Sequence, residues 1–267
     1  MPLSWPIAMP SKHRTRHPAP FFANLCIYAL FLFWTLLCLP LLLAGSLLSC
    51  LLKNRLVRVL RKAMWHFGSV QLFLLRPFLP VVCQNKELAA QHPGSIIVCT
   101  HQSFLDLYLF AAQSERNLCF VTKSWPFTKL FFFAPAMRAA GYLDAEALAP
   151  EALMQACSAR LQEGSTLVFF PEGSRSRNGE LGRFHAGAFL VAVREDTAVI
   201  PMIIHDSFQI FPPHARFCVP GTIHMELLSP VYPGAFRASD LPHRAMMKEV
   251  HRQIKQRRDL FTTGGSL

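Results

Sequence analysis

Short runs of apolar residues alternate with helical patterns from Val81 onward. The clearest helical pattern is Glu151–Gln162, with apolar residues on one face and Gly164 as a stop signal, and a last helix is predicted from Asp240 to about Leu260. Alternation of this kind predicts an α/β fold with a mixed, largely parallel sheet flanked by helices. The predicted strands are Val81–Gln84, Ser95–Thr100, Leu118–Thr122, Thr166–Phe170, Ala198–Ile204 and Thr222–Leu228.

The N-terminal part has a different pattern, because Phe21–Leu52 contains no charged residue. A continuous helix of this length, at about 1.5 Å per residue, would measure roughly 48 Å, against ~30 Å for the hydrocarbon core of a bilayer. Pro40 divides the run into Phe21–Leu39, which is long enough to span, and Leu41–Leu52, which is not. Three interpretations follow: a tilted and kinked span, a helical hairpin in one leaflet, or a cleaved signal sequence.

Positive charges decide between these interpretations only in part. Lys53, Arg55, Arg58, Arg61 and Lys62 follow the apolar run directly, and such a cluster favours an uncleaved membrane anchor retained on the cytoplasmic side. The anchored protein would then work at the cytoplasmic face of a membrane, which is the inner membrane if the source is bacterial.

Four segments are predicted from these patterns. Residues 1–20 form a basic, irregular leader, residues 21–52 the hydrophobic membrane anchor, residues 53–80 a basic linker, and residues 81–267 the catalytic domain. Within the linker, Leu56–Phe73 has apolar residues at helical spacing with basic residues between them. This amphipathic helix either lies at a membrane interface or packs on the domain with a solvated basic face.

Composition supports a membrane setting. Hydrophobic residues make up 52% of the chain and charged residues 16%, with a formal net charge of +11. A basic balance is typical of proteins that bind nucleic acid or an anionic membrane surface, and the apolar excess without a nucleic-acid motif favours membrane lipids over nucleic acid. The 8 cysteines contain no C-x-x-C pair, which indicates buried free thiols and not a disulfide framework or a zinc site.

The first candidate for chemistry is His101 with Asp106, directly after the predicted strand Ser95–Thr100. Loops at strand ends are where α/β folds place their active sites. A carboxylate that accepts a hydrogen bond from one imidazole nitrogen fixes the tautomer and leaves the other nitrogen as a base. A purely structural His–Asp hydrogen bond is the competing interpretation of so short a motif.

A second block, Val168–Gly179, also leads from an apolar run into a polar loop, and it contains the sequence Pro-Glu-Gly-Ser-Arg-Ser from Pro171 to Ser176. The two blocks together resemble the H-x4-D and F-P-E-G-T/S-R-S blocks of glycerolipid acyltransferases, of the 1-acyl-glycerol-3-phosphate (lysophosphatidate) acyltransferase type. Counterparts of the intermediate and late signatures are Lys123–Gly141 and Val199–Met202, so that the resemblance covers roughly 81–228.

This resemblance implies transfer of a fatty acyl group from acyl-carrier protein or acyl-CoA to the hydroxyl of a lyso-lipid, without a metal or another cofactor. Such a reaction needs a base for the hydroxyl proton and stabilisation of the oxyanion. A guanidinium and backbone N–H groups suit an acidic headgroup. The implied catalytic residues are His101 as base and Asp106 as its partner; the implied acceptor-binding residues are Glu172, Gly173, Ser174 and Arg175, with Lys123 as a further phosphate contact.

One departure from the family pattern leaves the acceptor open. Many relatives follow the glycine of the second signature with a segment that ends I/V-D-R, whose arginine meets the acceptor phosphate. Here Gly141–Asp144 is followed by Ala145 and Glu146, so that arginine is missing. Lysophosphatidate held by Arg175 alone is one expectation, and another lysophospholipid or lyso-ornithine lipid is the alternative.

Two features and two rival functions remain. The aromatic stretch Trp125–Phe133 either lines an acyl-chain groove or dips into the bilayer, or it is an ordinary core helix. The pair His205–Asp206 raises a metal-dependent hydrolase, although we find no further ligands at a consistent spacing. A non-catalytic, membrane-anchored lipid-binding protein is the other rival, and it would be indifferent to replacement of His101.

Overall fold

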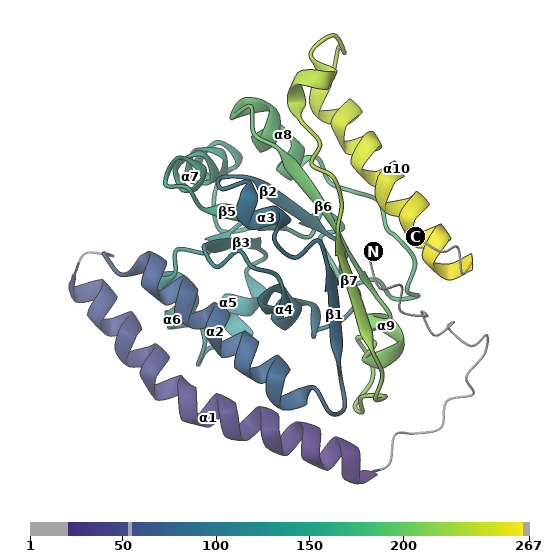
Figure 1. Cartoon of the computed structure of the whole chain (residues 1–267). Coiled ribbons are helices and arrows are strands. Elements are labelled where there is room, and N and C mark those ends of the chain that lie inside the picture. Colours follow the sequence, from purple (N-terminus) through teal and green to yellow (C-terminus); the bar gives the residue numbers. More distant parts are fainter. Residues whose placement is uncertain (1–20, 53–54, 264–267) are drawn as a thin grey trace, which may run out of the picture.

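The protein is described by a computed structural model that covers residues 21–52 and 55–263. A twisted seven-stranded sheet occupies its centre, with strand order β1-β7-β6-β2-β5-β3-β4 (Figure 1). The strands are β1 (Val81–Gln84), β2 (Ile96–Cys99), β3 (Leu118–Thr122), β4 (Leu143–Asp144), β5 (Thr166–Phe169), β6 (Val199–His205) and β7 (Ile223–Leu227). The helices are α1 (Phe21–Leu51), α2 (Val57–Leu75), α3 (Leu88–Gln91), α4 (Asp106–Leu109), α5 (Trp125–Lys129), α6 (Ala134–Ala139), α7 (Pro150–Gln162), α8 (Gly187–Arg194), α9 (Ser207–Ile210) and α10 (Pro242–Thr263).

The sheet confirms the predicted α/β class. Its strand pairs are parallel except β6 with β7, which is antiparallel. The patterns missed β4, because a strand of two residues is too short to show a periodicity. The last helix begins at Pro242, two residues later than the prediction.

Both faces of the sheet are covered by helices. Along β2, Ile96 and Val98 pack in the core beneath α7, α8 and α10, whereas Ile97 and Cys99 pack in the core beneath α1, α2 and α4. All four side chains are fully buried. Burial on both faces explains why this strand appears in the sequence as a continuous apolar run without polar alternation.

The apolar N-terminal run is one continuous helix, so the division at Pro40 was wrong. Pro40 lies inside α1, and the helix continues to Leu51. A hairpin formed within residues 21–52 is therefore excluded. Proline removes one backbone donor, but the packing of α1 against α2 and α6 along its length holds the helix together on either side of that position.

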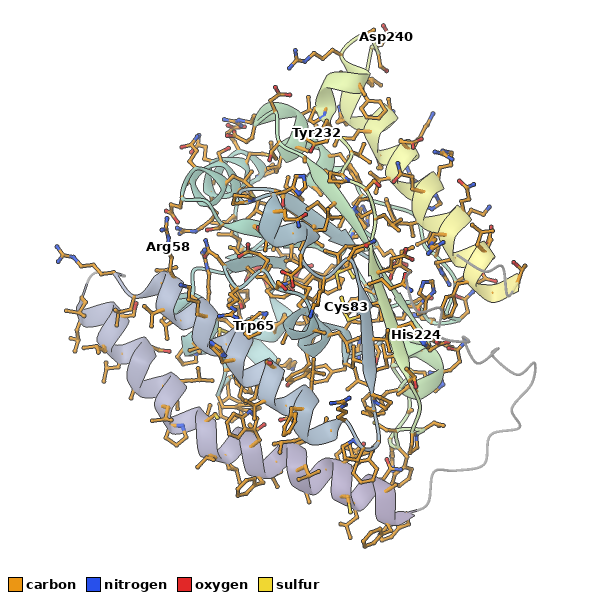
Figure 2. The ribbon with its side chains drawn as sticks, viewed as in Figure 1. Arg58, Trp65, Cys83, His224, Tyr232 and Asp240 are labelled. Atoms are coloured by element: carbon orange, nitrogen blue, oxygen red, sulfur yellow. The ribbon has the colours of Figure 1, made fainter. Side chains whose placement is uncertain are left out.

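Helices α1 and α2 pack against each other and lie across the same face of the molecule (Figure 1). Near the start of α1, the Asn24 side chain donates to the Cys218 carbonyl at 3.0 Å and accepts from the Cys218 N–H at 2.7 Å. Further along, the Trp34 indole donates to the Phe67 carbonyl of α2 at 2.9 Å. These bonds fix α1 along the domain. Side chains of α1 project outward from the domain (Figure 2), and Phe22, Phe33, Leu36 and Leu47 are among its exposed apolar residues.

The predictions for the leader and for the linker differ in what the structure describes of them. The predicted leader, residues 1–20, lies outside the described residues. The linker contains α2, whose buried side chains include Leu60, Phe67 and Leu75 and whose basic Arg58 and Lys62 are exposed. This helix therefore packs on the domain and still presents positive charge to its surroundings.

Candidate active site

His101 lies at the carboxyl edge of the sheet, two residues beyond the end of β2. Its Nδ1 is 2.9 Å from Oδ2 of Asp106, the first residue of α4. The His101 side chain is 13% exposed and the Asp106 side chain is fully buried. The imidazole also stacks on Phe170, with ring centroids 4.0 Å apart. The Asp106 carboxylate therefore holds the His101 ring at Nδ1, and Nε2 is the nitrogen that is left to act as a base.

Backbone groups fix the carboxylate in turn. The N–H groups of Gln102 and Ser103 donate to Asp106 Oδ2 at 2.6 and 2.8 Å. Asp106 Oδ1 is buried and has no hydrogen-bond partner in the described part of the chain. One oxygen thus accepts three N–H donors, which is an arrangement that holds both the charge and the orientation of the dyad.

The Glu172 carboxylate accepts two backbone hydrogen bonds within the domain. Its Oε1 accepts from the backbone N–H of His101 at 3.1 Å, and its Oε2 accepts from the N–H of Gly182 at 2.9 Å. Burial raises the pKa of this carboxyl, and the two backbone hydrogen bonds oppose that rise. The carboxylate therefore ties the two motif blocks to each other, and an acceptor contact for it remains a prediction.

The loop after β5 is locked to His101 by further bonds. The Ser176 N–H donates to the His101 carbonyl at 2.8 Å. Gly173 has a φ of +68°, and a side chain there would approach the His185 ring to 3.2 Å. Glycine is favoured at this position because the left-handed backbone is strained for other residues and a Cβ would crowd the His185 ring.

A carbonyl that the sequence motifs do not identify anchors the far end of this loop. The Gly179 carbonyl accepts from Gln102 Nε2 at 2.9 Å and from Arg258 Nη2, on α10, at 2.6 Å. Arg258 stands outside the motif blocks, so no signal in the sequence could identify this contact.

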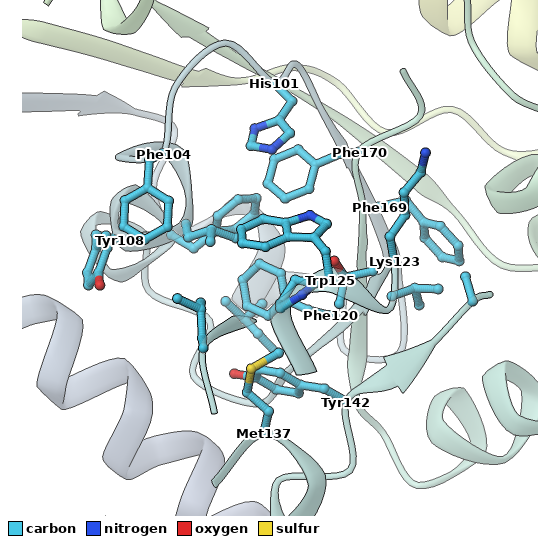
Figure 3. A pocket seen from close by; sticks show the side chains of 18 of the residues that line it. His101, Phe104, Tyr108, Phe120, Lys123, Trp125, Met137, Tyr142, Phe169 and Phe170 are labelled. Atoms are coloured by element: carbon cyan, nitrogen blue, oxygen red, sulfur yellow. The ribbon is translucent and has the colours of Figure 1, made fainter. Parts of the chain in front are cut away.

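A large cavity opens at the dyad. Its volume is about 690 Å³, and it is lined mainly by apolar side chains (Figure 3). His101, Phe104 and Phe170 border it at one end, and Met137 and Tyr142 lie at the other. A mostly apolar cavity with a few polar groups at its rim is suited to a ligand with a long hydrocarbon part and a polar head.

The rim carries both signs of charge. Gly173, Ser174 and Arg175, for which the resemblance implies acceptor binding, line the cavity together with Arg177. Lys123 also lines it, but its Nζ is 3.9 Å from the carboxylate of Glu146. Glu146 therefore places a negative charge close to where the family pattern has its missing arginine.

Residues of the aromatic stretch Trp125–Phe133 lie both at the cavity and at the surface, and its insertion into the bilayer stays a prediction. Trp125, Leu130 and Phe133 line the cavity, whereas Phe127 is buried and Phe131 is 74% exposed. The stretch forms one wall of the cavity and also presents an aromatic side chain at the surface.

The pair His205–Asp206 lies elsewhere. His205 is stacked on Phe261 of α10 with ring centroids 3.9 Å apart, and Asp206 Oδ2 is 3.2 Å from His224 Nδ1. Burial lowers the pKa of His205 to about 4. Within residues 21–52 and 55–263, the structure brings together no set of three or more His, Cys, Asp or Glu side chains that could hold a metal ion.

Comparison with known proteins agrees with the motif blocks. The Acyltransferase family profile matches residues 80–205. The chain is 31% identical over 161 residues to a chloroplastic 1-acyl-sn-glycerol-3-phosphate acyltransferase of Arabidopsis thaliana. This alignment covers 57% of the chain and 44% of the relative. The chain is also 25% identical over 247 residues to human 1-acyl-sn-glycerol-3-phosphate acyltransferase beta. That alignment covers 89% of the chain and 83% of the human protein.

A solved structure shares the fold. The crystal structure of the 1-acyl-sn-glycerophosphate acyltransferase PlsC from Thermotoga maritima superimposes with a TM-score of 0.64 at 21% identity, over 88% of this chain and 97% of that one. The chain spans about half the length of the first curated relatives it matches. In its two motif blocks, in the profile match of residues 80–205 and in its fold, the chain is similar to acyltransferases of the lysophosphatidate type.

Proposed function

We propose that the protein transfers a fatty acyl group from acyl-CoA or acyl-carrier protein to the free hydroxyl of 1-acyl-glycerol-3-phosphate. The observation that carries this proposal is the His101–Asp106 dyad at the mouth of an apolar cavity. His101 Nε2 takes the proton of the acceptor hydroxyl as its oxygen attacks the thioester carbonyl, and Asp106 stabilises the imidazolium that forms. The thiol leaves after the proton returns to sulfur, so the enzyme is regenerated without a covalent intermediate.

The rim of the cavity supports an anionic acceptor. Arg175 and Arg177 both line it, and a guanidinium binds phosphate in a bidentate manner. The loop that carries them is bonded to His101 through Ser176. This connection would place the acceptor headgroup at a fixed distance from the base, which is the main requirement for direct attack.

A second acceptor class is favoured by Glu146. Its carboxylate is half-exposed at the rim and close to Lys123, which lowers the net positive charge there. An acceptor with an ammonium group beside its phosphate, such as a lysophospholipid or lyso-ornithine lipid, would use this carboxylate.

Membrane association is part of the proposal. α1 is long and apolar enough to cross a membrane, and only 17% of its most apolar window is buried. Because α1 is bonded to the domain through Asn24 and Trp34, we propose that it lies in one leaflet with its outer face in the hydrocarbon. The cytoplasmic leaflet is the one that both acyl donors reach, and the basic residues of α2 suit its anionic lipids.

An acceptor panel tests the proposal. Detergent-solubilised protein is given radiolabelled acyl-CoA or acyl-carrier protein with lysophosphatidate, lysophosphatidylethanolamine or lyso-ornithine lipid. Arg175→Ala should raise KM for lysophosphatidate about tenfold or more, and Arg237→Ala, a surface arginine on another part of the domain, should not. Transfer to an ammonium-bearing acceptor that depends on Glu146 would support the second class, and no transfer to any acceptor would refute the proposal.

A further inference from the structure

The segment of residues 211–219, between α9 and β7, turns apolar side chains outward. Phe217 is 54% exposed and Val219 is 38% exposed, whereas Cys218 between them is buried. Arg216 is also exposed and places a positive charge beside Phe217. Contiguous exposed apolar residues with a polar rim mark surfaces that bind a protein partner or a membrane.

Two side chains of α1 hold this segment against the helix. The Asn24 side chain bonds both backbone groups of Cys218, and the Tyr28 hydroxyl donates to the Arg216 carbonyl. These bonds join positions that are 194 and 188 residues apart in the sequence. The segment and the start of α1 therefore form one surface.

The start of α1 presents a row of apolar side chains on this side. Residues three and four apart share one side of a helix, so Tyr28 belongs to a row whose other members are more than half exposed: Phe21, Leu25 and Leu32. Phe217 and Val219 flank the anchored Cys218, and they extend this row from α1 onto the domain. A surface that continues the outer face of α1 meets the same surroundings as that face.

The other end of the segment is connected to the active site. Ser103 Oγ, in the loop between the two residues of the dyad, donates to the Phe211 carbonyl at 2.7 Å. Pro213 lines the cavity that opens at His101. Each proline fixes its own φ, so Pro212 and Pro213 limit how far the segment can move from the cavity. The segment thus connects α1 to the mouth of the cavity.

From these contacts, and resting on the proposed function, we propose that residues 211–219 form a second membrane contact beside α1. Phe217 and Val219 enter the boundary between headgroups and hydrocarbon, and Arg216 lies at the level of anionic headgroups. A membrane fits this surface better than a protein partner, because the adjoining row of α1 is already placed in the hydrocarbon. The contact holds the mouth of the cavity at the bilayer surface, so a lyso-lipid enters it directly from the leaflet.

The fluorescence of an added indole tests the depth of the segment. Phe217→Trp and the matched control Tyr232→Trp are reconstituted in vesicles of equal parts phosphatidylcholine and phosphatidylglycerol, with the phosphatidylcholine either unlabelled or brominated on its acyl chains. Tyr232 is 53% exposed and lies at the end of the domain away from α1 (Figure 2). After subtraction of the wild-type signal, bromine should quench the added emission of Phe217→Trp about twofold or more and leave that of Tyr232→Trp unchanged. Equal quenching of both variants, or no quenching of Phe217→Trp, would overturn the second contact.

Kinetics separate a membrane contact from a part of the active site. Phe217→Ser should raise KM for lysophosphatidate about fivefold or more in the same vesicles, with kcat unchanged. In detergent micelles both constants should match those of the wild type, and Tyr232→Ser should match the wild type in both settings. An equal loss in micelles would overturn the contact, since the segment would then shape the site itself.

Two further outcomes are decisive. If Phe217→Ser converts a larger detergent-solubilised particle into a smaller one, the surface joins two copies of the chain and the membrane contact is overturned. If the wild type transfers no acyl group in vesicles or in micelles, the proposed function is refuted, whereas the quenching of Phe217→Trp still decides the membrane contact.

Discussion

Two substitutions of Asp106 separate its catalytic role from its structural role. In Asp106→Asn, the amide oxygen can take the place of Oδ2 and still accept from His101, Gln102 and Ser103. The amide NH2 then occupies the position of Oδ1, which has no partner in the described part of the chain. The fold should therefore lose only about 1–3 kcal/mol, the cost of one unpaired buried polar group.

Catalysis should suffer much more from the same change. The neutral amide cannot stabilise the imidazolium that forms when His101 takes the hydroxyl proton, and comparable dyads lose about 10⁴ in kcat when the carboxylate becomes an amide. We expect a loss of 10²-fold or more, roughly 3 kcal/mol in the barrier. Asp106→Ala instead leaves three N–H donors without their acceptor and should destabilise the fold by several kcal/mol.

The assay is single-turnover transfer from radiolabelled acyl-CoA to lysophosphatidate, together with denaturant unfolding of both variants in detergent. An Asp106→Asn protein with kcat within threefold of the wild type would refute the catalytic role of the dyad. Equal destabilisation of the two variants would refute the assignment of three hydrogen bonds to one oxygen.

Three further predictions concern other parts of the molecule. Glu172→Gln presents an NH2 to one of two backbone donors, so kcat should fall about tenfold and stability by about 1–3 kcal/mol; an unchanged kcat would contradict the proposed connection between the motif blocks. Because burial lowers the pKa of His205 from 6.5 to about 4, the unfolded chain binds a proton in that window that the folded chain does not, and stability should fall by about 3 kcal/mol as pH drops from 6.5 to 4. Urea unfolding of His205→Phe should lack this part of the decline, and an identical pH profile would refute it. Leu36→Asp on the exposed face of α1 should weaken sedimentation with anionic vesicles while detergent activity persists, and unchanged sedimentation would contradict the leaflet placement.

The sequence was sufficient to predict six of the seven strands and the contact between His101 and Asp106. Strands such as β2 are buried on both faces and therefore appear as uninterrupted apolar runs, and the two blocks lie at strand ends that a parallel sheet brings to one edge. The continuity of α1 could not be predicted, because Pro40 is a helix-breaking signal that is overridden only by packing against α2 and α6.

The contacts that complete the site depend on distant segments. Glu172 belongs to the motif, yet its bonds to His101 and Gly182 become visible only when β2 and β5 are neighbours. The bond from Arg258 to Gly179 spans 79 residues. Local patterns carry no information about such contacts, since they arise from tertiary packing.

The most direct test of the central claim is acyl transfer to lysophosphatidate by His101→Ala, with His66→Ala as the matched control, since His66 is exposed on α2. The account predicts that His101→Ala remains folded and loses kcat by 10³-fold or more, whereas His66→Ala behaves as the wild type. Transfer that persists in a folded His101→Ala protein at close to the wild-type rate would contradict the claim that His101 is the base.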